Sequence, residues 1–173
     1  MAIQDDEGQI SRPPTIDDLV TLCRRLNERG VRYVLIGGFA INYYGFPRAT
    51  ADIDLIVSPC TENISKIKEA LSFLQDNAIK EIALDDVQKY EVVRVADEIT
   101  IDLLKSACGI TYEDVGIEYF EFKGVQIPIA DLATMIKTKQ GIRPQDKQDL
   151  AFLLSLSEDE RQEILPQRHR ETR

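Results

Sequence analysis

The stretch GGFAINYYGFPRATADID, residues 37–54, decides how this chain must fold. A glycine pair ends one apolar run, a short helix-like segment and a turn follow, and two aspartates open a second apolar run. The first run, Val31–Ile36, is short and β-branched, which predicts a buried strand. The second run, Asp52–Ser58, predicts another strand, on which Asp52 and Asp54 share one face because side chains alternate along a strand. The stretch therefore predicts strand, glycine turn, helix and strand around an acidic face.

The rest of the chain alternates between helical periodicity and short apolar runs, which predicts an α+β fold with a mixed β-sheet flanked by helices and a short helical C-terminal part. Hairpin turns are expected at Ala96-Asp97-Glu98 and at Lys123-Gly124. The remaining expected helices lie at 15–30, 39–44, 61–77, from 131, from 144 and at 158–165, with a helical turn at 112–116, and the remaining expected strands lie at 82–84, 90–95, 99–104, 119–122 and 125–129.

We divide the chain into four parts on this pattern. Residues 1–14 are expected to form a flexible N-terminal arm, and residues 15–129 the core of the domain. Residues 130–165 are expected to form C-terminal helices packed on that core, and residues 166–173 a charged tail.

Composition limits the possible functions. The 173 residues are 43% hydrophobic and 29% charged, which suits one globular domain, and the net charge of −9 argues against broad nucleic-acid binding. No apolar run approaches the length of a membrane span, and the polar N-terminal segment does not look like a signal peptide, so we expect a cytoplasmic protein. Three scattered cysteines and a single histidine, His169, argue against a zinc site and against catalytic triads that need histidine.

Asp52 and Asp54 are candidate metal ligands. Two carboxylates on one strand face raise each other's pKa unless a cation neutralises them, and Mg²⁺ is the usual oxygen-bound cation, with Mn²⁺ as an alternative. Asp102, on a separate predicted strand, is the natural third carboxylate, and three acids on two strands could hold two metals for phosphoryl or nucleotidyl transfer. Gly37 and Gly38 would let the backbone approach a phosphate closely.

Each feature also has a plain structural interpretation. An Asp-x-Asp pair on a strand is more often a solvated edge, and a glycine pair after a strand is more often only a turn. Their combination in this order, with an acidic strand downstream, favours a functional site.

The segment Arg48-Ala49-Thr50-Ala51-Asp52-Ile53-Asp54 after a glycine pair resembles the nucleotidyltransferase superfamily typified by DNA polymerase beta. It is most similar to the small bacterial nucleotidyltransferases of the abortive-infection toxin group. The C-terminal run IPIADLATMIKTKQGIRPQDKQDLAFL also resembles that group, with matching positions at Lys139, Arg143, Asp146 and Asp149. The resemblance covers about residues 16–156.

The resemblance implies a nucleotidyltransferase fold and transfer of a nucleoside monophosphate from a nucleoside triphosphate to an acceptor hydroxyl, with release of pyrophosphate. It implies Asp52 and Asp54 as magnesium ligands, and Asp102 as the third metal ligand that favours deprotonation of the acceptor. The implied nucleotide-binding residues are Gly37, Gly38, Arg48, Thr50, Lys139 and Arg143.

Several alternatives stay open at this point. Lys137 competes with Lys139, Arg48 could instead pair with an acid of the triad, Thr50 could only cap the turn, and Asp146 and Asp149 could pair with Arg143 or cap a helix. The acceptor could be a small molecule, a protein or an RNA, and a homodimer or partner protein could complete the site. The competing functions are a non-catalytic binding or regulatory protein, such as one component of a toxin–antitoxin pair, and a metal-dependent phosphohydrolase, for which the chain offers few ligands.

Overall fold

Six strands form one mixed sheet in the computed structural model, which describes residues 10–156. The strand order is β3-β4-β2-β1-β8-β7. The strands of this sheet are β1 (Tyr33–Ile36), β2 (Asp52–Val57), β3 (Val92–Ala96), β4 (Thr100–Leu104), β7 (Ile117–Phe122) and β8 (Val125–Ala130). A separate two-stranded ribbon pairs β5 (Ser106–Ala107) with β6 (Ile110–Thr111).

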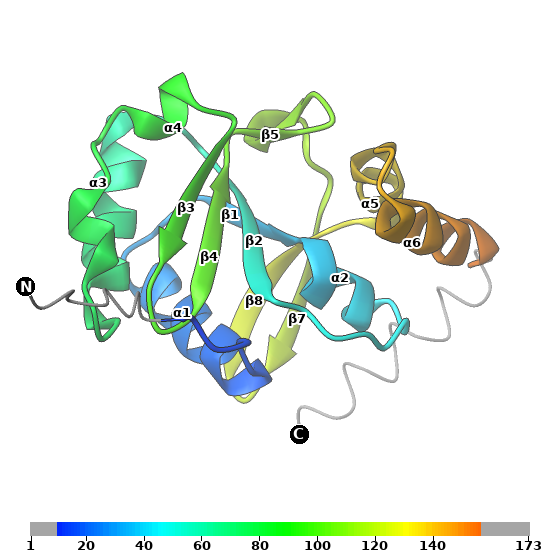
Figure 1. Cartoon of the computed structure of the whole chain (residues 1–173), viewed down its shortest axis with the longest axis horizontal. Coiled ribbons are helices and arrows are strands. Elements are labelled where there is room, and N and C mark those ends of the chain that lie inside the picture. The colour runs from blue at the N-terminus through cyan, green and yellow to red at the C-terminus, as the bar shows by residue number, and fades with distance from the viewer. Residues whose placement is uncertain (1–9, 157–173) are drawn as a thin grey trace, which may run out of the picture.

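Helices cover the sheet on both sides, as Figure 1 shows: α1 and α3 lie on one side, and α2, α5 and α6 lie toward the other. The helices are α1 (Ile16–Glu28), α2 (Gly37–Tyr43), α3 (Thr61–Ala70), α4 (Asp86–Lys89), α5 (Leu132–Thr138) and α6 (Pro144–Ser155), with short 3-10 turns at Leu71–Phe73, Ala78–Glu81 and Tyr112–Asp114. The predicted α+β class with a mixed sheet and a helical C-terminal part is confirmed.

The register of the central strands brings the acidic positions together. β2 and β4 run parallel with Asp54 opposite Asp102, and β1 and β2 run antiparallel with Ile36 opposite Asp54. The end of β1, where Gly37 follows Ile36, therefore lies beside the second aspartate of β2. Two short strand pairings thus gather residues from three separate parts of the chain.

The core forms where α1 and α3 pack on the sheet. Ile53 and Leu55 of β2 and Ile101 and Leu103 of β4 are buried on the face opposite the aspartates. Burial of these four side chains contributes about 1.5 to 3 kcal/mol each, so β2 and β4 are held firmly in place. The alternation predicted for these strands is confirmed, and it leaves the aspartates on the other face.

Both ends of α1 follow their sequence signals. Thr15 and Asp18 form a capping box at the N-terminus. At the other end the Gly30 N–H bonds to the Asn27 carbonyl and the Val31 N–H bonds to the Leu26 carbonyl, which is a Schellman motif with Gly30 in the left-handed region. The same motif explains why β1 begins at Tyr33, two residues later than predicted.

The predicted hairpin at Lys123-Gly124 is confirmed. Both residues have positive φ, 48° and 75°, as a two-residue type I′ turn requires. The hairpin that joins β3 to β4 is also confirmed. We did not predict the β5–β6 ribbon, whose turn at Cys108-Gly109 repeats the same positive-φ pattern.

The predicted strand at 82–84 is wrong. The Ile82 N–H bonds to the Ile79 carbonyl, and the Ala83 N–H bonds to the Asp86 side chain at 2.8 Å. Lys68 donates to the carbonyl of Ile82. These backbone groups are satisfied by local turns and a side chain, so no partner strand is needed, and the chain continues into α4.

The described part of the N-terminal arm is bonded to the β3–β4 turn. The Ser11 hydroxyl donates to the Asp97 carbonyl at 2.6 Å, and the Arg12 N–H donates to the Glu98 carbonyl at 2.9 Å. Residues 1–9, the predicted helix at 158–165 and the tail at 166–173 lie outside the described residues, and the four-part division of the chain remains a prediction. Within residues 10–156 no helix is long and apolar enough to cross a membrane.

Candidate active site

Three carboxylates converge on one face of the sheet. Asp52 and Asp54 project from β2, and Asp102 projects from the neighbouring strand β4. One oxygen from each lies within 4.8 Å of the others. The parallel pairing of β2 with β4 sets this distance, because residues opposite each other on adjacent strands present their side chains to the same face. Asp102 therefore lies beside the Asp-x-Asp pair, as expected from the sequence, and its role as a metal ligand stays a prediction.

Asp54 shows the electrostatic cost of this arrangement. Its pKa is raised to about 7, chiefly because burial disfavours the charged form, and then because Asp52 and Asp102 repel it. The positive charges of Lys139 and Arg143 lower the pKa of Asp54, but they do not cancel the rise. The centre of the cluster is therefore short of positive charge.

Arg94 on the edge strand β3 forms ion pairs with two carboxylates of the cluster. Its Nε and Nη2 donate to the two oxygens of Asp102, each at 2.8 Å, and Nη2 also donates to Oδ2 of Asp52 at 3.3 Å. The acids in turn raise the pKa of Arg94, Asp102 most of all. The guanidinium thus stands where a cation would neutralise the carboxylates, and three hard oxygen donors suit Mg²⁺ or Mn²⁺.

Gly37 is fitted against Asp54. A β-carbon at Gly37 would lie 2.1 Å from Oδ2 of Asp54, and the residue has a φ of 70°. Both the space and the backbone conformation exclude a side chain here. Gly37 and Gly38 are also the first residues of α2, whereas the helix was predicted to begin at Phe39. The glycine pair therefore joins β1 to α2 directly at the acidic cluster.

Gly38 is fitted against the loop that precedes β2. A β-carbon at Gly38 would lie 2.6 Å from the Thr50 hydroxyl and 3.5 Å from Nη1 of Arg48. The Thr50 hydroxyl donates to the Asp52 carbonyl at 2.9 Å, and Nη1 of Arg48 donates to the Ala49 carbonyl at 3.3 Å. Both side chains therefore shape the loop that delivers Asp52 to the site.

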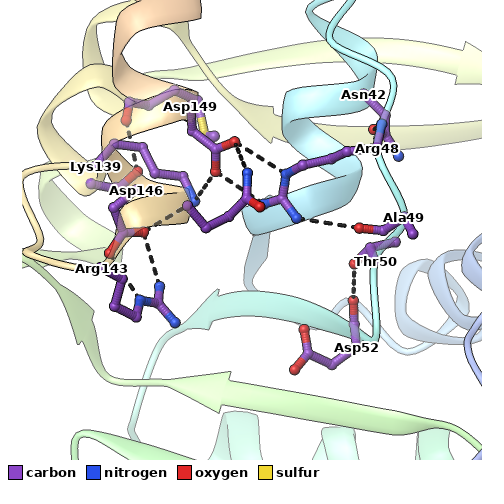
Figure 2. Close-up of polar contacts among 12 residues, drawn as sticks. Asn42, Arg48, Ala49, Thr50, Asp52, Lys139, Arg143, Asp146 and Asp149 are labelled. Carbon is purple, nitrogen blue, oxygen red and sulfur yellow. Dashed lines mark hydrogen bonds and ion pairs between the residues drawn. The ribbon is translucent and has the colours of Figure 1, made fainter.

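Asp149 ties the C-terminal helices to this loop, as Figure 2 shows. Its fully buried carboxylate accepts from Nε and Nη2 of Arg48 at 3.1 and 3.0 Å, and it lies 3.0 Å from Nζ of Lys139. Gln145 donates to it at 3.0 Å. A buried charge needs such partners, because desolvation otherwise disfavours it strongly. Arg48 thus pairs with Asp149. The alternative considered for it, an ion pair with Asp52, Asp54 or Asp102, is not found among the described residues.

Asp146 forms the second half of the same network. It accepts from Nε and Nη2 of Arg143 at 2.9 and 3.0 Å, and it lies 3.8 Å from Nζ of Lys139. A β-carbon at Gly141 would come within 2.4 Å of its carboxylate, so the turn between α5 and α6 packs closely on it. Of the alternatives left open for Asp146 and Asp149, pairing with Arg143 is found for Asp146, whereas Asp149 pairs with Arg48.

The three candidate phosphate-binding cations differ in access. The Lys139 side chain is 7% exposed between Asp146 and Asp149, whereas the Arg143 side chain is 77% exposed. The negative charges of Asp54 and Asp52 also raise the pKa of Arg143, after Asp146. Lys137 is exposed and forms no ion pair with the described residues. Arg143 is therefore open to the solvent and within electrostatic reach of the acidic cluster.

The predicted site residues form one continuous region. Gly37 meets Asp54, Gly38 meets Thr50 and Arg48, and Arg48 connects through Asp149 to Lys139. Sequence reasoning missed Arg94, although the hairpin register could have found it. Arg94 lies opposite Asp102 on β3, on the same face.

A mixed sheet with an Asp-x-Asp strand, a third aspartate on the parallel neighbour and a glycine pair at the preceding strand end defines the nucleotidyltransferase class. A family model described as "Nucleotidyl transferase AbiEii toxin, Type IV TA system" matches residues 21–172, and the chain belongs to this family. The resemblance to abortive-infection nucleotidyltransferases is thereby confirmed.

Two solved structures share the fold. The lincomycin-bound lincosamide antibiotic adenylyltransferase LnuA superposes with a TM-score of 0.56 at 16% identity, over 84% of this chain and 100% of that chain. A putative nucleotidyltransferase of Thermotoga maritima, TM1012, superposes with a TM-score of 0.51 at 17% identity, over 86% of this chain and 98% of that chain. No curated protein matches the sequence.

Proposed function

We propose that this chain transfers a nucleoside monophosphate from a nucleoside triphosphate to an acceptor hydroxyl. The acceptor oxygen bonds to the α-phosphorus, the bond between the α- and β-phosphates breaks, and pyrophosphate leaves. The convergence of Asp52, Asp54 and Asp102 beside a glycine pair, in a chain of a nucleotidyltransferase family, supports this most strongly.

Asp52 and Asp54 are proposed to bind Mg²⁺, or Mn²⁺ in its place. The donor set fits, because one oxygen from each of the three carboxylates lies within 4.8 Å of the others, and two of these carboxylates already pair with a positive charge, the Arg94 guanidinium. The bound ion would neutralise charge on the triphosphate and fix its orientation. Asp102, on the strand nearer the sheet edge, would complete the second metal position and take up the proton of the acceptor hydroxyl.

The cations on the other side of the site are proposed to receive the phosphates. The network of Arg48, Lys139, Arg143, Asp146 and Asp149 contains three positive and two negative charges, so it has a net positive charge. Arg143 would contact the triphosphate directly, because its side chain is exposed. Lys139 would contribute its positive charge from its buried position between Asp146 and Asp149.

The nucleotide is also proposed to contact the glycine pair and the loop before β2. Gly37 and Gly38 would offer backbone N–H groups to the β- and γ-phosphates, with no side chain in the way. Arg48 and Thr50 would act by holding this loop against Gly38, since both side chains already bond within it.

The family description supports a role as the toxin of a two-component system, with an antitoxin as the functional partner. The acceptor could be an RNA, a protein or a small molecule, and LnuA, named as a lincosamide antibiotic adenylyltransferase, illustrates the small-molecule case on this fold. The net charge of −9 favours an acceptor that does not need a broad basic surface.

Transfer of label is the direct test. Purified protein is incubated with each α-³²P-labelled triphosphate, Mg²⁺ and a cell lysate, and the label is followed into RNA, protein and small-molecule fractions. We expect label in one fraction with wild-type protein and none with Asp54→Asn. Absence of label in all fractions with all four triphosphates would contradict the proposal, and growth arrest on expression of wild type but not of Asp54→Asn would support the toxin role.

A further inference from the structure

Arg94 pairs with two of the three carboxylates in the acidic cluster. Its two contacts with Asp102 use both carboxylate oxygens, and a third contact uses an oxygen of Asp52. These are oxygens that the proposed metal would need. The guanidinium thus connects ligands on β2 and β4 from a third strand, β3.

We propose that Arg94 is a positioning residue that holds Asp52 and Asp102 together before the metal arrives and competes with the metal for their oxygens. This inference rests on the proposed function, because it concerns the loading of the same carboxylates. A guanidinium and a divalent cation on the same oxygens repel each other, so metal binding requires Arg94 to move away. Metal affinity is therefore set partly by a residue that never ligates the metal.

Exposure shows that Arg94 can make this movement. Its side chain is 60% exposed, although the Asp102 side chain that it binds is 8% exposed. It lies on β3, the edge strand of the sheet, and no further strand of residues 10–156 packs beside it. The Arg48–Asp149 pair differs, since there the arginine side chain is only 21% exposed and its partner is fully buried. Arg94 can swing into solvent without opening the core, and Arg48 cannot.

Two substitutions separate competition from a purely structural role. Arg94→Gln removes the charge, and Arg94→Lys keeps the charge but loses the planar fork that binds both Asp102 oxygens. Arg29→Gln is the matched control, because it removes one positive charge just after α1, where the Arg29 side chain forms an ion pair with Glu69 at 3.9 Å. Binding of Mn²⁺ alone is measured by electron paramagnetic resonance and by calorimetry.

We expect Arg94→Gln to bind Mn²⁺ at least about tenfold more tightly than wild type, because one competing charge is gone. Its metal-free melting temperature should fall, since Asp52 and Asp102 lose the guanidinium that pairs with them, and the rise of the melting temperature on adding Mn²⁺ should be larger than in wild type. Arg94→Lys should be intermediate, and Arg29→Gln should bind like wild type. Binding by Arg94→Gln that is equal to or weaker than that of Arg29→Gln would overturn the proposal.

A second measurement uses the wild-type chain and needs no variant to be stable. The Nε–H signal of Arg94 is assigned by its loss in Arg94→Lys, and its exchange with solvent is followed by NMR during titration with Mg²⁺. Faster exchange at saturation supports release of Arg94, and an unchanged protected signal overturns it. Label transfer is scored separately. If Arg94→Gln binds Mn²⁺ more tightly but no form of the protein transfers label, the proposed enzymatic function is refuted and this inference stands. If wild type transfers label but Arg94→Gln and wild type bind Mn²⁺ equally, this inference is refuted and the proposed function stands.

Discussion

Gly37 and Asp54 are in such close contact that a single β-carbon on the glycine would lie 2.1 Å from Oδ2 of the aspartate. The glycine directly follows Ile36, the last residue of β1, and the antiparallel register places Ile36 opposite Asp54 within β2. The position of the Asp54 carboxylate therefore depends directly on the absence of a side chain at residue 37.

Gly37→Ala should damage the site and the fold together. An alanine at a φ of 70° costs about 1 to 2 kcal/mol, and displacing the Asp54 carboxylate adds an overpacking cost of about 1 to 3 kcal/mol. We expect a loss of stability of about 3 kcal/mol in urea denaturation, together with loss of Mn²⁺ binding. The displaced carboxylate can no longer share a metal with Asp52.

Gly124→Ala is the control for this substitution. Gly124 has a φ of 75°, and a β-carbon there would meet nothing within 4 Å. It should therefore show the backbone cost of about 1 to 2 kcal/mol alone, with normal metal binding. Equal losses in the two variants would show that contact with Asp54 contributes nothing.

Asp54→Asn should abolish transfer and yet stabilise the metal-free protein. Because the folded pKa of about 7 is above the ordinary value of an aspartate, the folded state retains a proton that the unfolded chain releases. This favourable contribution is present at low pH and is lost as the pH rises from about 4 to about 7. At pH 8 the substitution should raise the free energy of unfolding by about 1 to 2 kcal/mol, less than the full shift because solvent reaches part of the carboxylate.

The measurement is urea denaturation of wild type and Asp54→Asn, without metal, at pH 5 and pH 8. The gain should be clear at pH 8 and small at pH 5, where wild-type Asp54 is protonated. Glu62→Gln, at a side chain that is 77% exposed, should change stability little at either pH. If Asp54→Asn raises the free energy of unfolding equally at both pH values, the gain does not come from removing the charge of Asp54.

Local sequence signals were enough to predict most of the fold. The apolar runs predicted β1, β2 and the β3–β4 hairpin. The capping box and Gly30 predicted the two ends of α1. The strand expected at 82–84 failed, because Asp86 and Lys68 bind the backbone groups that a strand would have used. The apolar character of a run does not show whether polar side chains elsewhere will form hydrogen bonds with its backbone in place of a neighbouring strand.

The candidate site was predictable only where its residues follow a pattern along the chain. Asp52, Asp54 and Asp102 could be found because strand alternation places them on one face. Arg94 was missed because its role depends on the pairing of β3 with β4, which alternation alone does not specify. The partner of Arg48, Asp149, lies 101 residues away, and no local signal connects the two.

Arg143 and Lys139 should differ in what they contribute. Arg143→Gln removes an exposed charge near the cluster, so it should weaken triphosphate binding by about tenfold and cost less than about 1 kcal/mol of stability. Lys139→Gln should reduce both binding and stability, because it leaves Asp149 and Asp146 short of a buried partner. Lys137→Gln, at the exposed competing position, should change neither.

Calorimetric titration with a non-hydrolysable triphosphate and urea denaturation of the three variants check this pattern. If Lys137→Gln loses triphosphate binding and Lys139→Gln binds normally, then Lys137, and not Lys139, is the phosphate-binding lysine.

Asp149 should control how firmly the C-terminal helices are attached to the site. Asp149→Asn leaves Arg48 and Lys139 without their fully buried partner, and loss of one member of a buried ion pair costs about 3 to 5 kcal/mol. Arg48→Gln should cost less, because Lys139 and Gln145 still contact the carboxylate. In a double-mutant cycle, the two substitutions should cost less together than the sum of their separate effects, with a coupling of about 1 to 3 kcal/mol. Additive effects on urea denaturation would show that the bridge between α6 and the loop before β2 does not stabilise the protein.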